Sequence, residues 1–108
     1  MEPQFANLID GKVVPCDIKD YIAKTEKNVQ SRQIGRYETD THMVSTVFLG
    51  INHAWTRDAR PIWFETMIFA KENDLLDQYC QRYTTLKEAQ IGHEATIALL
   101  KAEVAKRR

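Results

Sequence analysis

Hydrophobic and polar positions change their spacing several times along the chain, and each change predicts an element. Near the N-terminus, two short apolar stretches flank Asp10-Gly11, a residue pair that suits a tight turn with positive φ. We therefore expect a small N-terminal β-hairpin. Pro15 has no N–H to donate to a strand ladder, so the hairpin should end there, and Asp17 is placed to cap a helix.

Helical spacing follows the capping residue. Ile18, Tyr21, Ile22 and Val29 recur at the interval of a helix, and charged residues lie mostly on the other side. The pattern predicts a one-sided surface helix over about residues 17–30.

The middle of the chain is rich in β-branched and aromatic residues, which favour strands. Three strands are predicted at 34–37, 42–49 and 62–69. Both alternating faces of the second strand carry apolar side chains, so a central position, covered at least in part on both sides, is expected. A fourth strand is predicted near 78–83, where residues 75–76 could instead close a short helical turn.

The C-terminal helix has the clearest signal. Thr85 and Glu88 form the capping-box pair Thr-x-x-Glu directly before an apolar-periodic run, which predicts a helix over about 85–105. His93 interrupts its apolar stripe. Gly92 costs about 1 kcal/mol relative to alanine, unless the missing side chain permits a close approach to the sheet.

These elements predict one α+β domain over residues 1–108. It should contain an antiparallel sheet of about four strands and the N-terminal hairpin, packed with the two helices. The 108 residues can bury a single core, and 44% hydrophobic with 28% charged residues excludes disordered and low-complexity chains. Fifteen basic residues balance fifteen acidic ones, so there is no bulk attraction to nucleic acid or an acidic membrane.

The cysteines and the apolar runs indicate in which cellular compartment the protein works and which metal sites are excluded. Cys16 and Cys80 lie far apart and fit no zinc pattern, which suggests free thiols in a reducing compartment; no metal or cofactor is expected. The longest apolar runs, such as 43–49, are too short to cross a bilayer, and a secretory signal is not evident. A cytoplasmic protein without membrane contact is predicted.

Two stretches carry a family resemblance. Residues 42–53 read His-Met-Val-Ser-Thr-Val-Phe-Leu-Gly-Ile-Asn-His, and 61–69 read Pro-Ile-Trp-Phe-Glu-Thr-Met-Ile-Phe. Together with 14–17 and Gly92-His93, they resemble a mostly uncharacterised family of small phage and prophage proteins. Asn52 stands where that family usually has aspartate. The resemblance implies a phage or mobile-element accessory protein made inside a bacterial cell.

The loop between the second and third strands is a candidate contact site. It contains His53, Trp55, Arg57 and Arg60. Cationic and aromatic groups in one loop could stack on a nucleotide or hold an acidic protein surface. A solvated turn is an equally good interpretation.

Glu65 and His93 are polar residues in apolar surroundings. A buried carboxylate needs a companion, and the candidates for Glu65 are His93, Tyr83, Arg82 and Ser45. One hypothesis places Glu65 opposite His93, between sheet and helix, as an acid–base pair or as a structural pair. The structural pair is favoured because no nucleophile, phosphate loop or metal set accompanies it, and His93 by itself fits a core histidine with one hydrogen-bonded ring nitrogen.

Two functional classes follow. The leading hypothesis is a non-catalytic binding module that contacts a host or phage protein, with inhibition of a bacterial antiviral defence as one role. The alternative is a small enzyme or nucleotide-binding protein using Glu65 with His53 or His93. An exposed patch around Trp55 and Trp63 would favour the module, and an apolar pocket holding Glu65 beside a histidine would favour the alternative. Exposed strand edges, or the 91–104 face of the last helix, would permit a homodimer.

Overall fold

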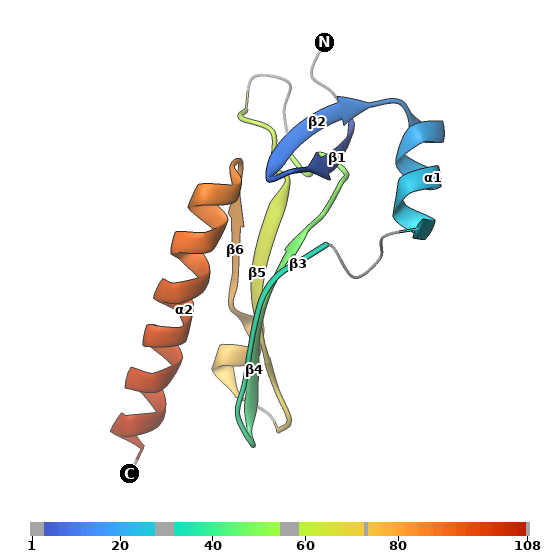
Figure 1. The fold of residues 1–108 in the computed structure, drawn as a ribbon. Helices are drawn as coiled ribbons and strands as arrows, with labels where there is room; N and C mark the ends of the chain where they lie inside the picture. The colour runs from blue at the N-terminus through green and yellow to red at the C-terminus, as the bar shows by residue number, and fades with distance from the viewer. Residues whose placement is uncertain (1–3, 28–31, 55–58, 73, 108) are drawn as a thin grey trace.

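The computed structural model describes residues 4–27, 32–54, 59–72 and 74–107 (Figure 1). Their elements, in chain order, are β1 (Phe5–Ile9), β2 (Lys12–Cys16), α1 (Ile18–Lys27), β3 (Gln33–Glu38), β4 (His42–Phe48), β5 (Phe64–Ala70), the short 3-10 helix η2 (Leu75–Gln78), β6 (Cys80–Tyr83) and α2 (Leu86–Lys106). β1 and β2 form a hairpin, and β3-β4-β5-β6 form a four-stranded antiparallel sheet in chain order. The predicted α+β architecture is confirmed.

The sheet has one face toward α2. Phe64, Thr66 and Ile68 of β5 are buried and alternate with the less buried Glu65 and Met67. β4 shows the same alternation and lies between β3 and β5, so its predicted central position is confirmed. The long helix runs along the buried side of all four strands (Figure 1).

The start of α2 follows from its capping box. Thr85 Oγ1 accepts from the Glu88 N–H at 3.1 Å, and Glu88 Oε1 accepts from the Thr85 N–H at 3.0 Å. These bonds satisfy amides that have no partner within the helix. α2 therefore begins within one residue of its predicted position.

Gly92 allows the predicted close approach of α2 to the sheet. A Cβ at this position would lie 2.1 Å from the Tyr83 hydroxyl oxygen. Gly35 of β3 has a similar role, because a Cβ there would lie 2.6 Å from His93 Nε2. The two aromatic rings therefore occupy space that only glycine leaves open.

The N-terminal elements also follow their local signals. Asp10 and Gly11 have φ values of 50° and 78°, as the predicted tight turn requires. Asp17 Oδ1 accepts from the Asp20 N–H at 2.8 Å and so caps α1, as predicted. The described part of this helix ends at Lys27, and the predicted residues 28–30 lie outside the described residues.

The segment before α2 contains both structures that the sequence allowed. Leu75–Gln78 form a single 3-10 turn, and the strand is shorter than predicted, Cys80–Tyr83. Asp74 caps the turn by accepting from the Leu76 N–H at 3.0 Å. A carboxylate cap at this position favours the turn over a longer strand.

Polar groups divide the interior into two apolar clusters. One contains Phe48, Trp63 and Phe64, and the other contains Val44, Ile68 and Leu100; the complete clusters also include Ala6 and Ala89. Trp63 is only 3% exposed, so it does not contribute to the exposed patch considered above. Its burial follows from its place directly before β5, where its N–H donates to the Tyr83 carbonyl at 3.0 Å.

Candidate functional site

The hypothesis that Glu65 and His93 face each other is wrong. Glu65 lies on the face of β5 away from α2, where its Oε2 accepts from Arg82 Nε at 3.0 Å. His93 Nδ1 instead lies 2.7 Å from Thr46 Oγ1 in the core. Because Phe64 and Thr66 point toward α2, the residue between them must point the other way. The alternative function can therefore not use Glu65 together with His93 as an acid–base pair.

His93 belongs to a buried polar belt between sheet and helix. Thr46 Oγ1 also lies 2.6 Å from Thr66 Oγ1, and Thr96 Oγ1 donates to the Gly92 carbonyl at 2.7 Å. Burial raises the pKa of the Tyr83 phenol beside this belt, and hydrogen bonds from Thr66 and Thr96 oppose the shift in part. The prediction of a core histidine with a hydrogen-bonded ring nitrogen is confirmed.

The predicted contact loop is described only at its two ends. Trp55 and Arg57 lie outside the described residues. His53 is exposed, and its backbone N–H donates to the Ile62 carbonyl at 3.2 Å. Arg60 is exposed and pairs with Glu88 at 3.0 Å, and this bond contributes most to lowering the pKa of the Glu88 carboxyl.

Asn52 closes the base of the same loop. Its Oδ1 accepts from the Ala54 N–H at 2.9 Å and from the Ile62 N–H at 3.0 Å. An aspartate carboxylate can accept the same two bonds. The asparagine at this position therefore keeps a structural role that does not need a negative charge.

A second polar cluster lies at the opposite end of the sheet. His42 is buried, with Nε2 2.7 Å from Asp74 Oδ2 and Nδ1 2.8 Å from Thr41 Oγ1. Arg107, the C-cap of α2, donates two hydrogen bonds to Asp74, at 2.7 and 3.0 Å. Hydrogen bonds from Arg107, then from the Leu76 N–H and from His42, hold the pKa of Asp74 well below its usual range. The carboxylate therefore links β4, η2 and α2.

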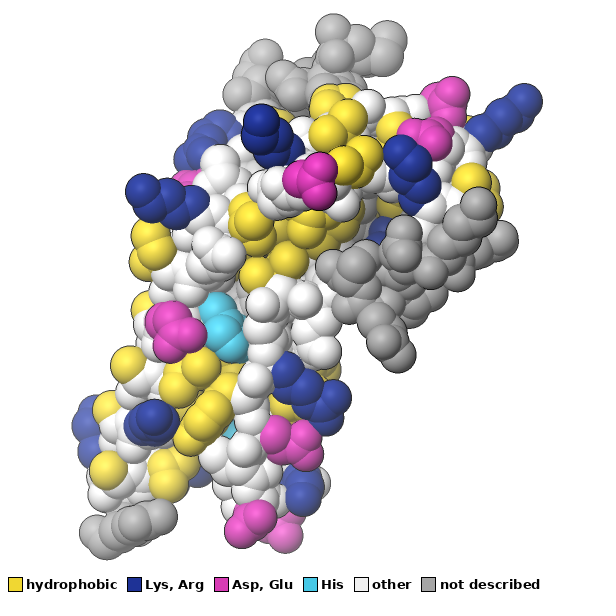
Figure 2. All heavy atoms as spheres, in the orientation of Figure 1, with side chains coloured by type: hydrophobic (Ala, Val, Ile, Leu, Met, Phe, Trp, Pro, Cys, Tyr) yellow, Lys and Arg dark blue, Asp and Glu magenta, His cyan; other side chains and the backbone are white. Residues whose placement is uncertain are grey.

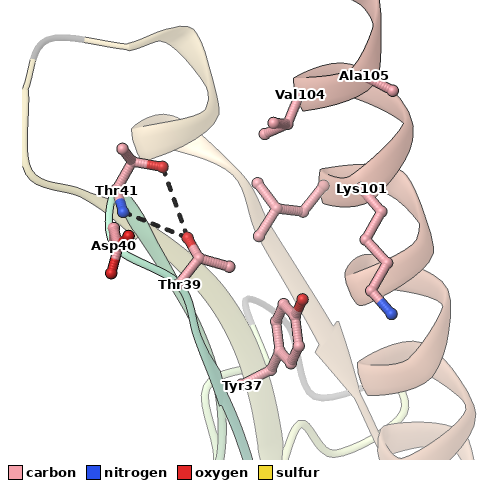
Figure 3. A pocket seen from close by; sticks show the side chains of 8 residues that line it. Tyr37, Thr39, Asp40, Thr41, Lys101, Val104 and Ala105 are labelled. Carbon is pink, nitrogen blue, oxygen red and sulfur yellow. Dashed lines mark hydrogen bonds between the residues drawn. The ribbon is translucent and has the colours of Figure 1, made fainter.

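Two adjoining cavities border this cluster. One, of about 420 Å³, lies between the β3–β4 turn and the last turns of α2. In Figure 3, Tyr37, Thr39 and Thr41 face Lys101 and Val104 across this space. The second, of about 450 Å³, is lined by residues that include His42, Asp74 and Arg107. We call the two together the distal groove.

The sequence contained no signal for the distal groove. His42 begins a strand, and the basic residues at the chain end fit the helix dipole, so neither required a partner. Asp74 was part of a polar turn. Only a rule that pairs a helix-capping Asp with a distant basic residue could have suggested the contact with Arg107, which lies 33 positions away.

The most exposed apolar groups near the N-terminus form a third feature. Ile18 and Ile22 of α1 are 52% and 47% exposed, and hydrophobic side chains gather at the surface over the hairpin (Figure 2). Phe5 of β1 forms an isolated bridge with Ile51, another exposed residue. We call the set the N-terminal apolar surface; its members are Ile9, Val14, Ile18, Ile22 and Ile51.

Comparisons with protein-family models, curated proteins and solved structures found no significant match. Among the described residues, no group of three or more histidine, cysteine or acidic side chains could hold a metal ion. Within the same part of the chain, neither helix combines the length and the apolar character needed to cross a bilayer.

Proposed function

We propose that this protein is a binding module that holds a protein partner through the N-terminal apolar surface. The half-exposure of Ile18 and Ile22 is the observation that carries the proposal. These residues share one face of α1, because residues four positions apart are neighbours on a helix. A helix that leaves such a face in water is typical of a surface that another molecule covers.

The contacts of α1 explain why this face is left open. The helix meets the hairpin through Tyr21, whose ring centroid lies 5.3 Å from that of Phe5, and through Asp20, whose carboxylate accepts from the Asn7 side chain at 3.2 Å. Lys24 also lies 3.7 Å from Asp20 and is exposed. Aliphatic residues bordered by exposed charges match the apolar centre and polar rim of protein interfaces.

The resemblance to small phage proteins supports the choice of partner. We propose a host or phage protein inside a bacterial cell, with a component of an antiviral defence as the specific hypothesis. Inhibition by occupation requires only a surface of complementary shape, so the chemistry of an active site is not needed. The absence of bulk charge on the chain also favours a protein partner over nucleic acid.

The test is capture of a partner followed by a binary binding measurement. The tagged protein is recovered from infected bacteria, its partner is identified by mass spectrometry, and affinity is measured with both proteins purified. Ile22→Asp is expected to weaken binding at least about tenfold, as is typical when a central interface residue is lost.

Leu75→Asp is the matched control. Leu75 is 87% exposed but belongs to η2, away from the N-terminal apolar surface. This variant should bind like the wild type. Equal losses in both variants, or no loss in Ile22→Asp, would contradict the proposed surface.

The distal groove supports a second candidate function, binding of a nucleotide. Lys101 Nζ lies 5.3 Å from the centroid of the Tyr37 ring, beside the groove. An aromatic ring and a cation can receive a base and a phosphate, respectively. Calorimetric titration with nucleoside triphosphates should show binding that Lys101→Gln weakens and Lys87→Gln, elsewhere on α2, leaves unchanged; no heat at millimolar nucleotide would reject this function.

A further inference from the structure

β3 is an edge strand of the four-stranded sheet, and among the described residues no other strand pairs with its outer edge. Tyr37 is in register with Val44, and the Thr39 N–H donates to the His42 carbonyl at 2.8 Å. Alternate residues of an antiparallel strand direct their N–H and C=O groups to opposite sides. The backbone groups of Arg36 and Glu38 therefore point away from β4. Such an edge is a template for another strand.

The side chains of these two residues lie on the face away from α2. Arg36 is in register with Ser45, and Glu38 with Met43, residues that alternate with the buried Val44 on β4. Both side chains are about half exposed, at 54% and 51%. The edge therefore carries one positive and one negative side chain, two positions apart on one face.

We propose that two copies of this chain associate through antiparallel pairing of β3 with β3, with Tyr37 on the twofold axis. In this register Arg36 of each copy lies opposite Glu38 of the other. Both residues direct their backbone groups outward, so each opposed pair can exchange two backbone hydrogen bonds. The outward direction of the backbone N–H and C=O groups and the charges of the side chains thus select the same register.

Other registers lack this agreement. If Arg36 lay on the axis, two guanidinium groups would be directly opposed, and if Glu38 lay there, two carboxylates would be. Like charges opposite each other destabilise a strand pair, whereas opposite charges stabilise it. The pairing centred on Tyr37 is isologous, and it closes after two copies.

The ion pair between Arg36 and Glu38 within one chain does not prevent the pairing between two copies. Arg36 Nη2 lies 2.7 Å from Glu38 Oε2 within one chain, but an ion pair so exposed contributes little. On the other face, Tyr37 packs against the cluster that contains Leu100, and the groove between Tyr37 and the end of α2 leaves part of this side of the strand open (Figure 3). Opposed tyrosines in a non-hydrogen-bonded pair come close enough to pack.

Sedimentation velocity over a concentration series tests the proposal. The wild-type chain should show a monomer–dimer equilibrium. Arg36→Glu and Glu38→Arg should each weaken dimerisation at least about tenfold, because each places like charges opposite each other. An equimolar mixture of these two variants should form the heterodimer, detectable by native mass spectrometry, since both cross-strand pairs are then complementary.

A backbone variant tests the pairing itself when it is compared with Glu38→Gln, which removes the same charge but keeps the N–H. Glu38→Pro removes an N–H that points away from β4, so the sheet keeps its own hydrogen bonds while the dimer loses two. This variant should be monomeric with a wild-type circular dichroism spectrum. Arg60→Glu, which reverses the charge of another exposed ion pair, is the control and should dimerise normally.

The proposal is overturned by any of three results. These are a wild-type chain that stays monomeric to about millimolar concentration, the weakest affinity of interest, a dimer that survives Glu38→Pro, and charge variants whose mixture forms no heterodimer. None of them bears on the N-terminal apolar surface, so the proposed function is tested separately.

Discussion

Both helices carry apolar residues at helical spacing, but α2 buries more of its apolar face than α1 does. Ala89 and Leu100 of α2 are buried against the sheet, whereas Ile18 and Ile22 of α1 remain about half exposed. The difference lies in what each helix covers. α2 follows four strands, while α1 lies against a two-stranded hairpin that is too small to cover it. Amphipathic spacing therefore identifies the apolar face of a helix, and the neighbouring surface determines whether that face is buried.

The largest expected effect is in the core beneath α2. Phe64 is fully buried and packs against Phe48 with ring centroids 5.4 Å apart. Phe64→Ala should lower the free energy of unfolding by about 3–5 kcal/mol, because apolar contacts are lost and a cavity remains. Urea denaturation provides the measurement. A loss below about 1 kcal/mol would mean that the α2 side is not the stabilising core.

Gly92→Ala should have a smaller but still unfavourable effect. Alanine raises helix propensity by about 1 kcal/mol, yet its Cβ would lie 2.1 Å from the Tyr83 hydroxyl oxygen. We expect a net loss of about 1–3 kcal/mol from overpacking. Thermal unfolding should show a lower midpoint than for Gln90→Ala, a change at an exposed position of the same helix. A stabilised Gly92→Ala protein would show that the sheet can move away from α2.

The cluster of His42, Asp74 and Arg107 should make the stability of the protein depend on pH in the acid range. The pKa of Asp74 is lowered in the folded chain, chiefly by Arg107, so the unfolded chain takes up this proton at a higher pH. Its stabilising contribution is therefore complete above about pH 4, the ordinary pKa of Asp, and is lost as pH falls below that value. Urea midpoints measured between about pH 5 and pH 2 should decline less steeply in Asp74→Asn. Equal slopes in both proteins would contradict the assignment.

The smallest effect is expected on α1. Ile22→Asp should lower the free energy of unfolding by about 1 kcal/mol or less, because about half of the side chain is already in water. Chemical denaturation of this variant beside the wild type gives the comparison with the α2 side. A loss of about 2 kcal/mol or more would instead place Ile22 in the monomer core.

The sequence was sufficient to predict features that depend only on residues close to one another in the chain. The Asp10-Gly11 turn, the Asp17 cap and the Thr85–Glu88 capping box involve atoms within a few positions of one another, and each has the predicted geometry. Gly92 was also informative, because a glycine within a strong helix needs a reason. The reason, Tyr83, comes from the strand before that helix.

Long-range chemistry was not predictable in the same way. Strand alternation placed Glu65 on the face opposite Phe64, but it did not indicate which face α2 would cover. The contact between His42, Asp74 and Arg107 joins three elements that have no local relation. An exposed patch around Trp55 and Trp63 would have favoured the binding module, but Trp63 is buried directly before β5.

Short-range forces thus set the elements and their apolar faces, since hydrogen bonding and side-chain spacing within one turn or strand depend only on nearby residues. Tertiary packing determined the rest: which face of β5 meets α2, which histidine side chains are buried, and how much of the apolar face of each helix is covered. Those outcomes depend on the area and shape that distant segments offer one another, and a linear pattern does not contain that information.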